Sequence, residues 1–490
     1  MLFNSLQYGV FLLLIIAVYF LSPARFRWMI LLASSYYFYM SWNPKLVVLI
    51  LFTTVVSYVS ALKIEEAKSK KQAKRILIFG VSLCLLCLFF FKYFNFFSLS
   101  VMELLRSLSL PVGDFTIKVM LPVGISFYTF QTLSYIVDVY RKDMEAEKHF
   151  GYYALYVSFF PQLVAGPIER ATSLLPQLKT KKAFDRTLAV SGMRLICYGL
   201  FKKIVVADTV AAYVNRVYNS IHEFDSLAIV IATLFFAVQI YCDFSGYSDI
   251  AIGSARIFGI KLMTNFNSPY FACSVKDFWR RWHISLSGWF SDYVYVPLGG
   301  SRAGRPRHIL NLLTIFLLSG LWHGANWTFV VWGLYHGILS AVEVFTLPIT
   351  EKLSKKISGS APHAVFTGLR VALVFALVCF SWIMFRANSI SDMNYAIMQL
   401  FSGSDLSFEN ITQSFKLMGI TRLGLSLNLL SIIVVAAWDF INLKKSPLEL
   451  LQKKGTFVNN AATYFFAFAV LLRIFTNSSI SAADFIYFQF

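Results

Sequence analysis

The chain has 490 residues, of which 57% are hydrophobic and only 14% are charged, and its formal net charge is +19. A soluble domain has about 25% charged residues, so this composition excludes a soluble globular protein and indicates a polytopic membrane protein. The basic residues gather in loops between apolar runs. This distribution suits anionic lipid headgroups, and we expect membrane lipid and no nucleic acid as a partner.

Apolar runs long enough to cross a bilayer recur along the chain. They lie near 3–22, 28–42, 45–62, 76–98, 119–139, 188–206, 227–244, 309–347, 364–385, 423–442 and 456–475. Such runs are too long and unbroken for barrel strands, and the backbone in lipid must satisfy its own hydrogen bonds. We therefore predict an all-α polytopic membrane protein in a single domain, residues 1–490, with about ten to twelve transmembrane helices of roughly 20 residues each.

The first apolar run, residues 1–22, has basic residues after it rather than before it. A secretory signal has the opposite order, so we expect a retained helix. The loops at 63–75, 169–203 and 256–308 carry six, eight and eight Lys or Arg residues, which places them in the cytoplasm by the positive-inside rule. Counting back three spans from the first loop puts the N-terminus on the extracytoplasmic side.

The stretches at 169–187 and 256–308 are the longest weakly apolar parts of the chain, and proline and glycine recur in and around them. Both residues interrupt helices, and irregular backbone at membrane depth is tolerated only where it is buried or lines a wet cavity. We therefore predict re-entrant and interfacial helices here, beside a cavity that opens to the cytoplasm.

Two carboxylates, Asp243 and Asp249, lie in otherwise apolar sequence and are candidate substrate-binding residues. A spacing of six does not place them on one helical face, but a helix break at Gly246 would bring them together. Such a pair suits cation binding, orientation of a base, or pairing with Arg256 or Arg280. We favour structural pairing because buried charges are usually kept by partners.

Aromatic and basic side chains crowd together at Trp279, Arg280, Arg281, Trp282 and His283. Trp and Arg are typical of membrane interfaces, so an interfacial amphipathic helix explains most of this segment, and it explains His283 least. The arginine pair would also hold phosphate through its planar forks, which predicts an anionic donor substrate. An arginine pair beside lipid phosphate has the same sequence, so both interpretations stay open.

His323 lies in the apolar segment 317–337, which contains no Lys, Arg, Asp or Glu. An ionisable group is costly in hydrocarbon, so a functional site is the default hypothesis. The spacing predicts that Asn326 at i+3 and Trp327 at i+4 share its helical face. A core histidine bonded across helices and a general base for a hydroxyl are equally compatible with this pattern, whereas His336 is expected to be structural.

Five motifs in order resemble the membrane-bound O-acyltransferase (MBOAT) family, in the bacterial branch typified by alginate O-acetylation proteins. They are PVGISFYTFQTLSYIVDVYR at 122–141, FFPQLVAGPIER at 159–170, QIYCDFSGYSDIAIG at 239–253, FWRRWHISLSGWF at 278–290 and LSGLWHGANWTFVVWGLYHG at 318–337. The terminal FIYFQF at 485–490 also fits this branch.

The resemblance implies a ring of transmembrane helices around a central tunnel, which joins a cytoplasmic donor pocket to an extracytoplasmic acceptor side. The essential histidine of the family, in its LWHG context, corresponds to His323, and a second polar position corresponds to His283. These two are the predicted catalytic residues. Ser291 departs from the pattern, because related sequences commonly have Arg there, and this puts in doubt any donor or partner contact at that position.

Further roles are assigned on the same basis. Arg280 and Arg281 would attract the donor, and Trp322 with Trp327 would exclude water. The predicted substrate-binding residues are Arg280, Arg281, Trp322, Asn326, Trp327, Asp243 and Asp249.

The implied reaction moves an acyl group, with acetyl favoured, from cytoplasmic acetyl-CoA to a hydroxyl outside. We expect no bound cofactor and no metal. The expected partner is an extracytoplasmic SGNH-type acyltransferase, and the final acceptor is a polysaccharide of the cell envelope or an exopolysaccharide. The expected location is the bacterial inner membrane.

Two alternatives stay open. D-alanyl transfer to teichoic acid would use a carrier protein's phosphopantetheine thioester instead of free CoA. A proton-coupled transporter would also contain ionisable residues within the membrane, although no inverted repeat is evident in the sequence.

Overall fold

The computed structural model describes residues 1–476 except 114, 118–120, 165, 303, 358, 404, 406 and 454. The secondary structure of these residues is helical, with no strand. The FIYFQF motif at 485–490 lies outside the described residues. The chain divides into two compact units, Met1–Ile196 with Ile250–Met263, and Cys197–Asp249 with Thr264–Phe490. A single domain over the whole chain stays a prediction.

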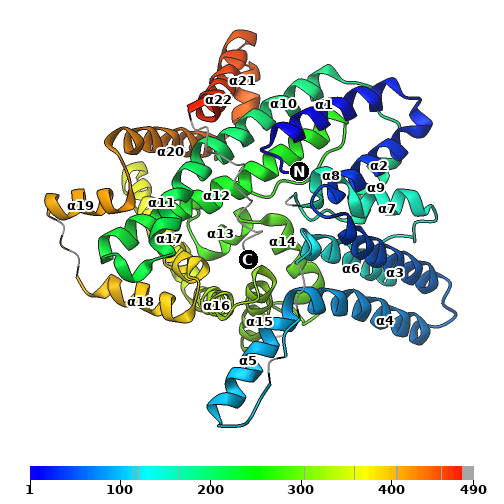
Figure 1. Cartoon of the computed structure of the whole chain (residues 1–490), viewed down its shortest axis with the longest axis horizontal. Helices are drawn as coiled ribbons and strands as arrows, with labels where there is room; N and C mark the ends of the chain where they lie inside the picture. The colour runs from blue at the N-terminus through cyan, green and yellow to red at the C-terminus, as the bar shows by residue number, and fades with distance from the viewer. Residues whose placement is uncertain are drawn as a thin grey trace. The chain divides into compact units, whose positions relative to one another are not determined.

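The first unit is built around three helices that lie side by side (Figure 1). Its helices are α1 (Leu6–Leu21), α2 (Arg27–Met40), α3 (Val47–Glu65), α4 (Lys70–Leu88), α5 (Phe94–Ser107), α6 (Ile125–Arg141), α7 (Phe150–Ser158), α8 (Phe160–Leu163), α9 (Ala171–Lys179) and most of α10 (Arg186–Leu200). The central three are α3, α4 and α6. Small residues let α3 and α4 approach closely, because a Cβ on Gly80 would lie 2.3 Å from the Ser60 hydroxyl oxygen. Close packing of this kind holds helices together in lipid, where no hydrophobic force drives them together.

The second unit contains the residues that the sequence analysis singled out. Its helices are a π-helical segment (Phe201–Ala207), α11 (Asp208–Tyr218), most of α12 (Ser226–Ile257), α13 (Val275–Arg281), α14 (Ile284–Phe290), α15 (Arg305–His323), α16 (Trp327–Lys356), α17 (Ser360–Arg386), α18 (Ile390–Phe401), α19 (Phe408–Met418), α20 (Arg422–Asn442), α21 (Pro447–Lys453) and α22 (Thr456–Thr476). The most apolar stretch of α12 is 72% buried inside the protein, whereas the corresponding stretches of α16 and α20 are each only 22% buried. The exposed apolar faces of α16 and α20 are therefore suited to lipid.

Seven helical stretches in the described residues are long and apolar enough to cross a bilayer. They are Pro44–Glu65, Lys70–Ser107, Ser226–Ile257, Trp327–Lys356, Ser360–Arg386, Arg422–Asn442 and Phe457–Thr476. The helices α1 and α6, with 16 and 17 residues, are shorter. The all-α polytopic class is confirmed, whereas ten to twelve spans and a ring around a tunnel stay predictions.

The two Pro- and Gly-rich stretches fold as predicted into broken helices. The short helix α9 lies in the first stretch, 169–187, and the short helix α8 lies just before it. The short helices α13 and α14 lie in the second stretch, 256–308. Extended backbone and turns join them, with positive φ angles at Gly259, Gly299, Gly300 and Gly304. Glycine tolerates these angles without steric cost.

Candidate active site

Helices α15 and α16 form an antiparallel hairpin, visible side by side in Figure 1. A Cβ on Gly320 would lie 2.2 Å from the Phe329 carbonyl oxygen, and one on Gly333 would lie 2.4 Å from the Phe316 carbonyl oxygen. The two backbones approach this closely only because glycine has no side chain. His323 is the last residue of α15 and therefore lies at the end of the hairpin.

The hairpin turn separates His323 from the residues that were predicted to share its face. The next residue is a glycine in extended conformation, and Asn326 then caps α16 by accepting a hydrogen bond from the backbone N–H two residues later, at 3.1 Å. The prediction of one helical face for His323, Asn326 and Trp327 is wrong, because a glycine and an asparagine cap end one helix and begin another. Trp327 is 47% exposed, and its role in excluding water stays a prediction.

His323 is buried among aromatic rings. His323 is only 3% exposed. The ring centres of Trp322, Trp332 and Phe385 lie 5.0, 5.0 and 5.3 Å from the centre of its imidazole ring. Trp322 also lies 5.8 Å from the ring of His283. The two histidine rings are 6.4 Å apart, centre to centre. The two residues predicted to be catalytic therefore lie close together in one aromatic environment.

His283 occupies a strained turn between α13 and α14. Its φ and ψ are 43° and 54°, in the left-handed region that costs a residue with a side chain roughly 1–2 kcal/mol. It is completely buried, and burial lowers the pKa of its imidazole to about 3. His283 is therefore neutral near pH 7. The Nδ1 atom lies 3.2 Å from the amide oxygen of Asn265.

The predicted interfacial amphipathic helix covers only part of this segment, and its place at a membrane interface stays a prediction. Helix α13 ends at Arg281, and Trp282 follows in an extended conformation and is only 1% exposed. The segment is instead a helix, a turn and a second helix, with its tryptophan in the interior. The arginine pair is also divided, because Arg281 Nε donates to Asp277 at 2.8 Å, whereas Arg280 lines a cavity.

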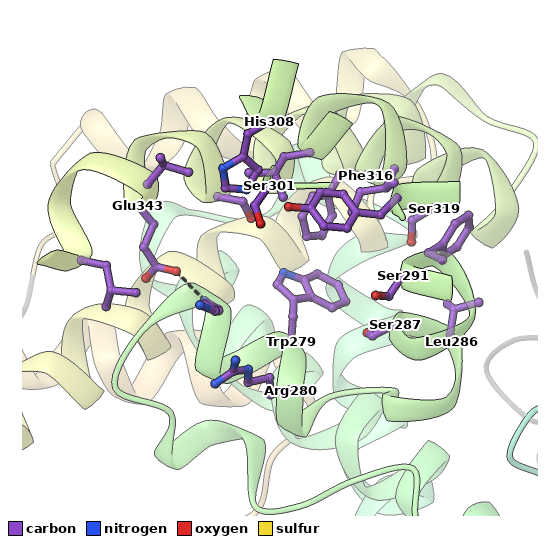
Figure 2. Close-up of a pocket in the computed structure, with 18 of the residues that line it drawn as sticks. Trp279, Arg280, Leu286, Ser287, Ser291, Ser301, His308, Phe316, Ser319 and Glu343 are labelled. Carbon is purple, nitrogen blue, oxygen red and sulfur yellow. Dashed lines mark hydrogen bonds between the residues drawn. The ribbon is translucent and has the colours of Figure 1, made fainter. Parts of the chain in front are cut away.

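This cavity has a volume of about 650 Å³ and is drawn in Figure 2. It is lined by Lys276, Trp279, Arg280, Leu286, Ser287, Phe290, Ser291, Tyr295, Ser301, His308, Leu312, Ile315, Phe316, Ser319, Ser340, Glu343, Val344, Leu347 and Pro348. Figure 2 shows Trp279 in the middle, with Ser287, Ser291 and Ser319 on one side and Glu343 on the other. The α15 residues recur every three or four positions, so one face of this helix forms a wall.

Neither His283 nor His323 lines the cavity, but residues close to each of them along the chain do. Ser319 precedes His323 by one helical turn on α15, whereas Ser287 lies on α14, four residues after His283, which is the left-handed residue before that helix. Residues four apart on a helix share a face. The position of Ser291 on the wall also shows that the departure from the family pattern falls inside this cavity.

Glu343 is a cavity residue that sequence reasoning missed. Its two carboxylate oxygens accept the backbone N–H groups of Val275 and Lys276 at 2.7 and 2.6 Å. These are the first residues of α13, and a carboxylate stabilises a helix at that end. The available signal was a lone acid within the apolar run near 309–347, which is costly in a membrane and therefore informative.

Asp243 and Asp249 pair with lysines and do not line the cavity. Asp249 lies 2.6 Å from the ammonium of Lys202, and Asp243 lies 2.8 Å from that of Lys203, which also pairs with Asp208 at 2.8 Å. Structural pairing was the favoured interpretation, but its partners were expected to be arginines. The lysine pair in the apolar run near 188–206 was the signal for these contacts.

The predicted helix break at Gly246 is wrong, because α12 continues through it. A Cβ there would lie 2.7 Å from the carbonyl oxygen of Gly199. Glycine is present so that two backbones can approach closely rather than to end the helix. His336, which was expected to be structural, is buried and lies 3.0 Å from the Ser381 hydroxyl of the neighbouring helix.

In the described ranges, no three His, Cys, Asp or Glu side chains gather closely enough to hold a metal ion.

Known proteins share this sequence over most of its length. The sequence profile of MBOAT, the membrane-bound O-acyltransferase family, matches residues 147–385, which include both histidines. A probable alginate O-acetylase of Azotobacter vinelandii is 36% identical over 441 residues, or 90% of this chain and 85% of the relative. The chain belongs to the membrane-bound O-acyltransferase family. As an MBOAT protein, it is an O-acyltransferase that crosses the membrane several times.

Other relatives are named for different transferred groups and acceptors. A peptidoglycan O-acetyltransferase of Helicobacter pylori is 35% identical over 391 residues, covering 74% of this chain and 71% of the relative. A teichoic acid D-alanyltransferase of Bacillus subtilis is 28% identical over 278 residues, covering 54% and 69%.

Proposed function

We propose that this protein transfers an acetyl group from cytoplasmic acetyl-CoA to a hydroxyl group on the outer side of the bacterial inner membrane. The observation that carries the proposal is the 6.4 Å separation of the buried His283 and His323 rings. A cavity of about 650 Å³ is lined by Ser319, one helical turn before His323, and by Ser287, four residues after His283, although neither histidine lines it. Catalytic groups beside a preformed cavity are the usual arrangement of an enzyme site.

The cavity suits a long and anionic donor. Its volume lies within the roughly 300–1,000 Å³ that is typical of small-molecule sites. Along α15 its wall extends from His308 to Ser319, which corresponds to a helical rise of about 17 Å. Lys276 and Arg280 supply positive charge, and Arg binds phosphate well through its planar fork. Arg281 is less suited than Arg280 to bind the donor, because its guanidinium already donates a hydrogen bond to Asp277.

The charge at the start of α15 supports outward transfer from the cytoplasm. This helix begins at Arg305 and ends at His323, so its 19 residues rise about 28 Å, although it is not one of the seven stretches apolar enough to cross a bilayer. Arg305 and Arg307 favour the cytoplasm for the first end. On this orientation His323 would lie toward the outer side, where the acceptor arrives; the extracytoplasmic N-terminus stays an expectation from the positive-inside rule.

The proposed chemistry is a direct transfer. His323 takes the proton from the acceptor hydroxyl as a general base. The hydroxyl oxygen attacks the thioester carbonyl carbon, so that a C–O bond forms and the C–S bond breaks. The imidazolium of His323 returns its proton to the departing CoA thiolate. His283 orients the acceptor or relays the proton, and Trp322 keeps water away from the thioester.

A polysaccharide is the proposed final acceptor. Relatives named as alginate O-acetylases and as a peptidoglycan O-acetyltransferase support this choice. We expect an extracytoplasmic SGNH-type acyltransferase to receive the acetyl group first and to pass it on. D-alanyl transfer is the second candidate, favoured by the similarity to a teichoic acid D-alanyltransferase.

The test is acetyl transfer in proteoliposomes. The purified protein is supplied with radiolabelled acetyl-CoA on the side of its basic loops and with a candidate SGNH-type acyltransferase on the other side. We expect label on the partner with the wild type, a fall of roughly 10²- to 10⁴-fold with His323→Ala, and no change with His363→Ala. His363 is an exposed histidine of α17 and serves as the matched control.

Three results would contradict the proposal. Full transfer by a folded His323→Ala variant would remove His323 from the reaction. Transfer of D-alanine from a carrier-protein thioester, without transfer from acetyl-CoA, would establish the second candidate. Proton conduction by the wild type without any donor, and without label transfer, would make the protein a transporter.

A further inference from the structure

Asn265 contacts the turn that contains His283 at four points. It lies in the extended segment between α12 and α13 and is 1% exposed. Its backbone oxygen accepts the N–H of Ile284 at 2.9 Å. Its side-chain oxygen accepts the N–H and the hydroxyl of Ser285, at 3.2 and 2.9 Å, and lies 3.2 Å from Nδ1 of His283. One side chain thus touches the histidine and the first turn of the helix that follows it.

These contacts determine which nitrogen of His283 carries the proton. A backbone N–H only donates, so the Asn265 atom facing the N–H of Ser285 must be the amide oxygen and not the amide nitrogen. The same oxygen faces His283 Nδ1, and it has lone pairs but no hydrogen. Nδ1 therefore carries the proton, and Nε2 carries the lone pair. In the other tautomer, the lone pair of His283 Nδ1 would face a lone pair of the Asn265 amide oxygen at 3.2 Å, and the two would repel each other.

The backbone of the turn is held separately from this side-chain contact. The N–H of Ile284 bonds to the Asn265 carbonyl, and the N–H of Asn267 bonds to the Arg281 carbonyl, both at 2.9 Å. Such bonds on both sides of His283 hold its left-handed conformation, because strained residues persist where their surroundings over-determine them. Truncating the Asn265 side chain leaves both bonds in place, so the turn should survive while the imidazole loses its constraint.

We infer that Asn265 is a positioning residue that holds His283 with its proton on Nδ1 and its lone pair on Nε2. The inference rests on the proposed acyl transfer. In this tautomer Nε2 accepts a proton or a hydroxyl hydrogen bond, which is the property required of a second base beside His323. Without Asn265 both tautomers and other ring orientations become accessible, and only part of the enzyme is competent at any moment.

The test compares three variants in the acetyl-transfer assay. We expect Asn265→Ala to lower kcat about 10- to 100-fold, less than complete loss of a general base, with an unchanged KM for acetyl-CoA. Asn265→Asp keeps the accepting oxygen and should recover most of kcat. Its negative charge favours the imidazolium, so the acid limb of the pH–rate profile should move to higher pH. Asn267→Ala is the control, because the Asn267 side chain contacts Asn442 instead.

A double variant separates positioning from general stability. If Asn265 acts through His283, then Asn265→Ala combined with His283→Ala should be no slower than His283→Ala alone. Additive losses in the double variant, wild-type kcat in Asn265→Ala, or an unmoved pH profile in Asn265→Asp would each overturn the inference. If Asn265→Ala does not fold, the pH profile of Asn265→Asp decides.

The same assay distinguishes this failure from failure of the proposed function. A wild type that transfers acetyl, together with an Asn265→Ala variant of equal rate, overturns only the role of Asn265. A folded wild type that transfers nothing from acetyl-CoA overturns the proposed function itself.

Discussion

Replacing Gly320 by alanine should disable the enzyme through the hairpin that carries His323. The added Cβ would lie 2.2 Å from the carbonyl oxygen of Phe329 and 3.2 Å from Cα of Gly333. Carbon–oxygen contacts settle near 3.3 Å, so α15 and α16 must separate by about 1 Å. Both neighbours are backbone atoms and cannot rotate away. Overpacking of this kind costs about 1–3 kcal/mol, and a misplacement of about 1 Å can lower a rate roughly 10²-fold.

The measurement combines thermal unfolding in detergent with the acetyl-transfer rate. Gly368→Ala in α17 is the matched control, because a Cβ there meets nothing within 4 Å. Alanine in place of an exposed helical glycine should be neutral or stabilising by up to about 1 kcal/mol. If Gly320→Ala keeps both the melting midpoint and the rate of the wild type, close packing does not hold His323 in place.

Three further outcomes are expected. Lys203→Met leaves the buried carboxylates of Asp208 and Asp243 without their shared cation and should destabilise by about 3–5 kcal/mol; an unchanged melting midpoint would refute this. Ser291→Arg adds a cation to the cavity and should lower the KM for acetyl-CoA about two- to fivefold, for a gain of roughly 0.5–1 kcal/mol, with kcat unchanged; a higher KM would place the donor elsewhere. Burial lowers the pKa of His283 from 6.5 to about 3, so the unfolded state binds its proton first and stability is lost as the pH falls below about 6.5. The melting midpoint should therefore fall less between pH 7 and pH 4 in His283→Gln, and an equal fall in both proteins would contradict it.

The sequence singles out two histidines that the structure brings together, but it predicts the elements that hold them less well. His283 and His323 stand out because an imidazole is costly in apolar surroundings, and both lie in the same aromatic environment. The helix break after His323 was missed because the i+3 and i+4 spacing was read without the capping residues. The glycine after His323 and the cap at Asn326 were the stronger signals.

Partners that are distant in sequence could not be predicted. Asp243 was expected beside an arginine, yet Lys203 meets it from a neighbouring helix, and one sequence does not record which helices pack together. Asn265 is equally inconspicuous, since asparagine in a loop is ordinary. Its contact with His283 is visible only in the folded structure, where the turn at His283 packs against it.

The hairpin of α15 and α16 also bears on how the site is assembled during synthesis. Its two helices are consecutive, and only residues 324–326 separate them, so closing it costs little chain entropy. Local contacts of this kind form before distant ones. His323 therefore reaches its turn while the chain is still being made, and Phe385, which completes the ring of aromatics around it, arrives only with α17.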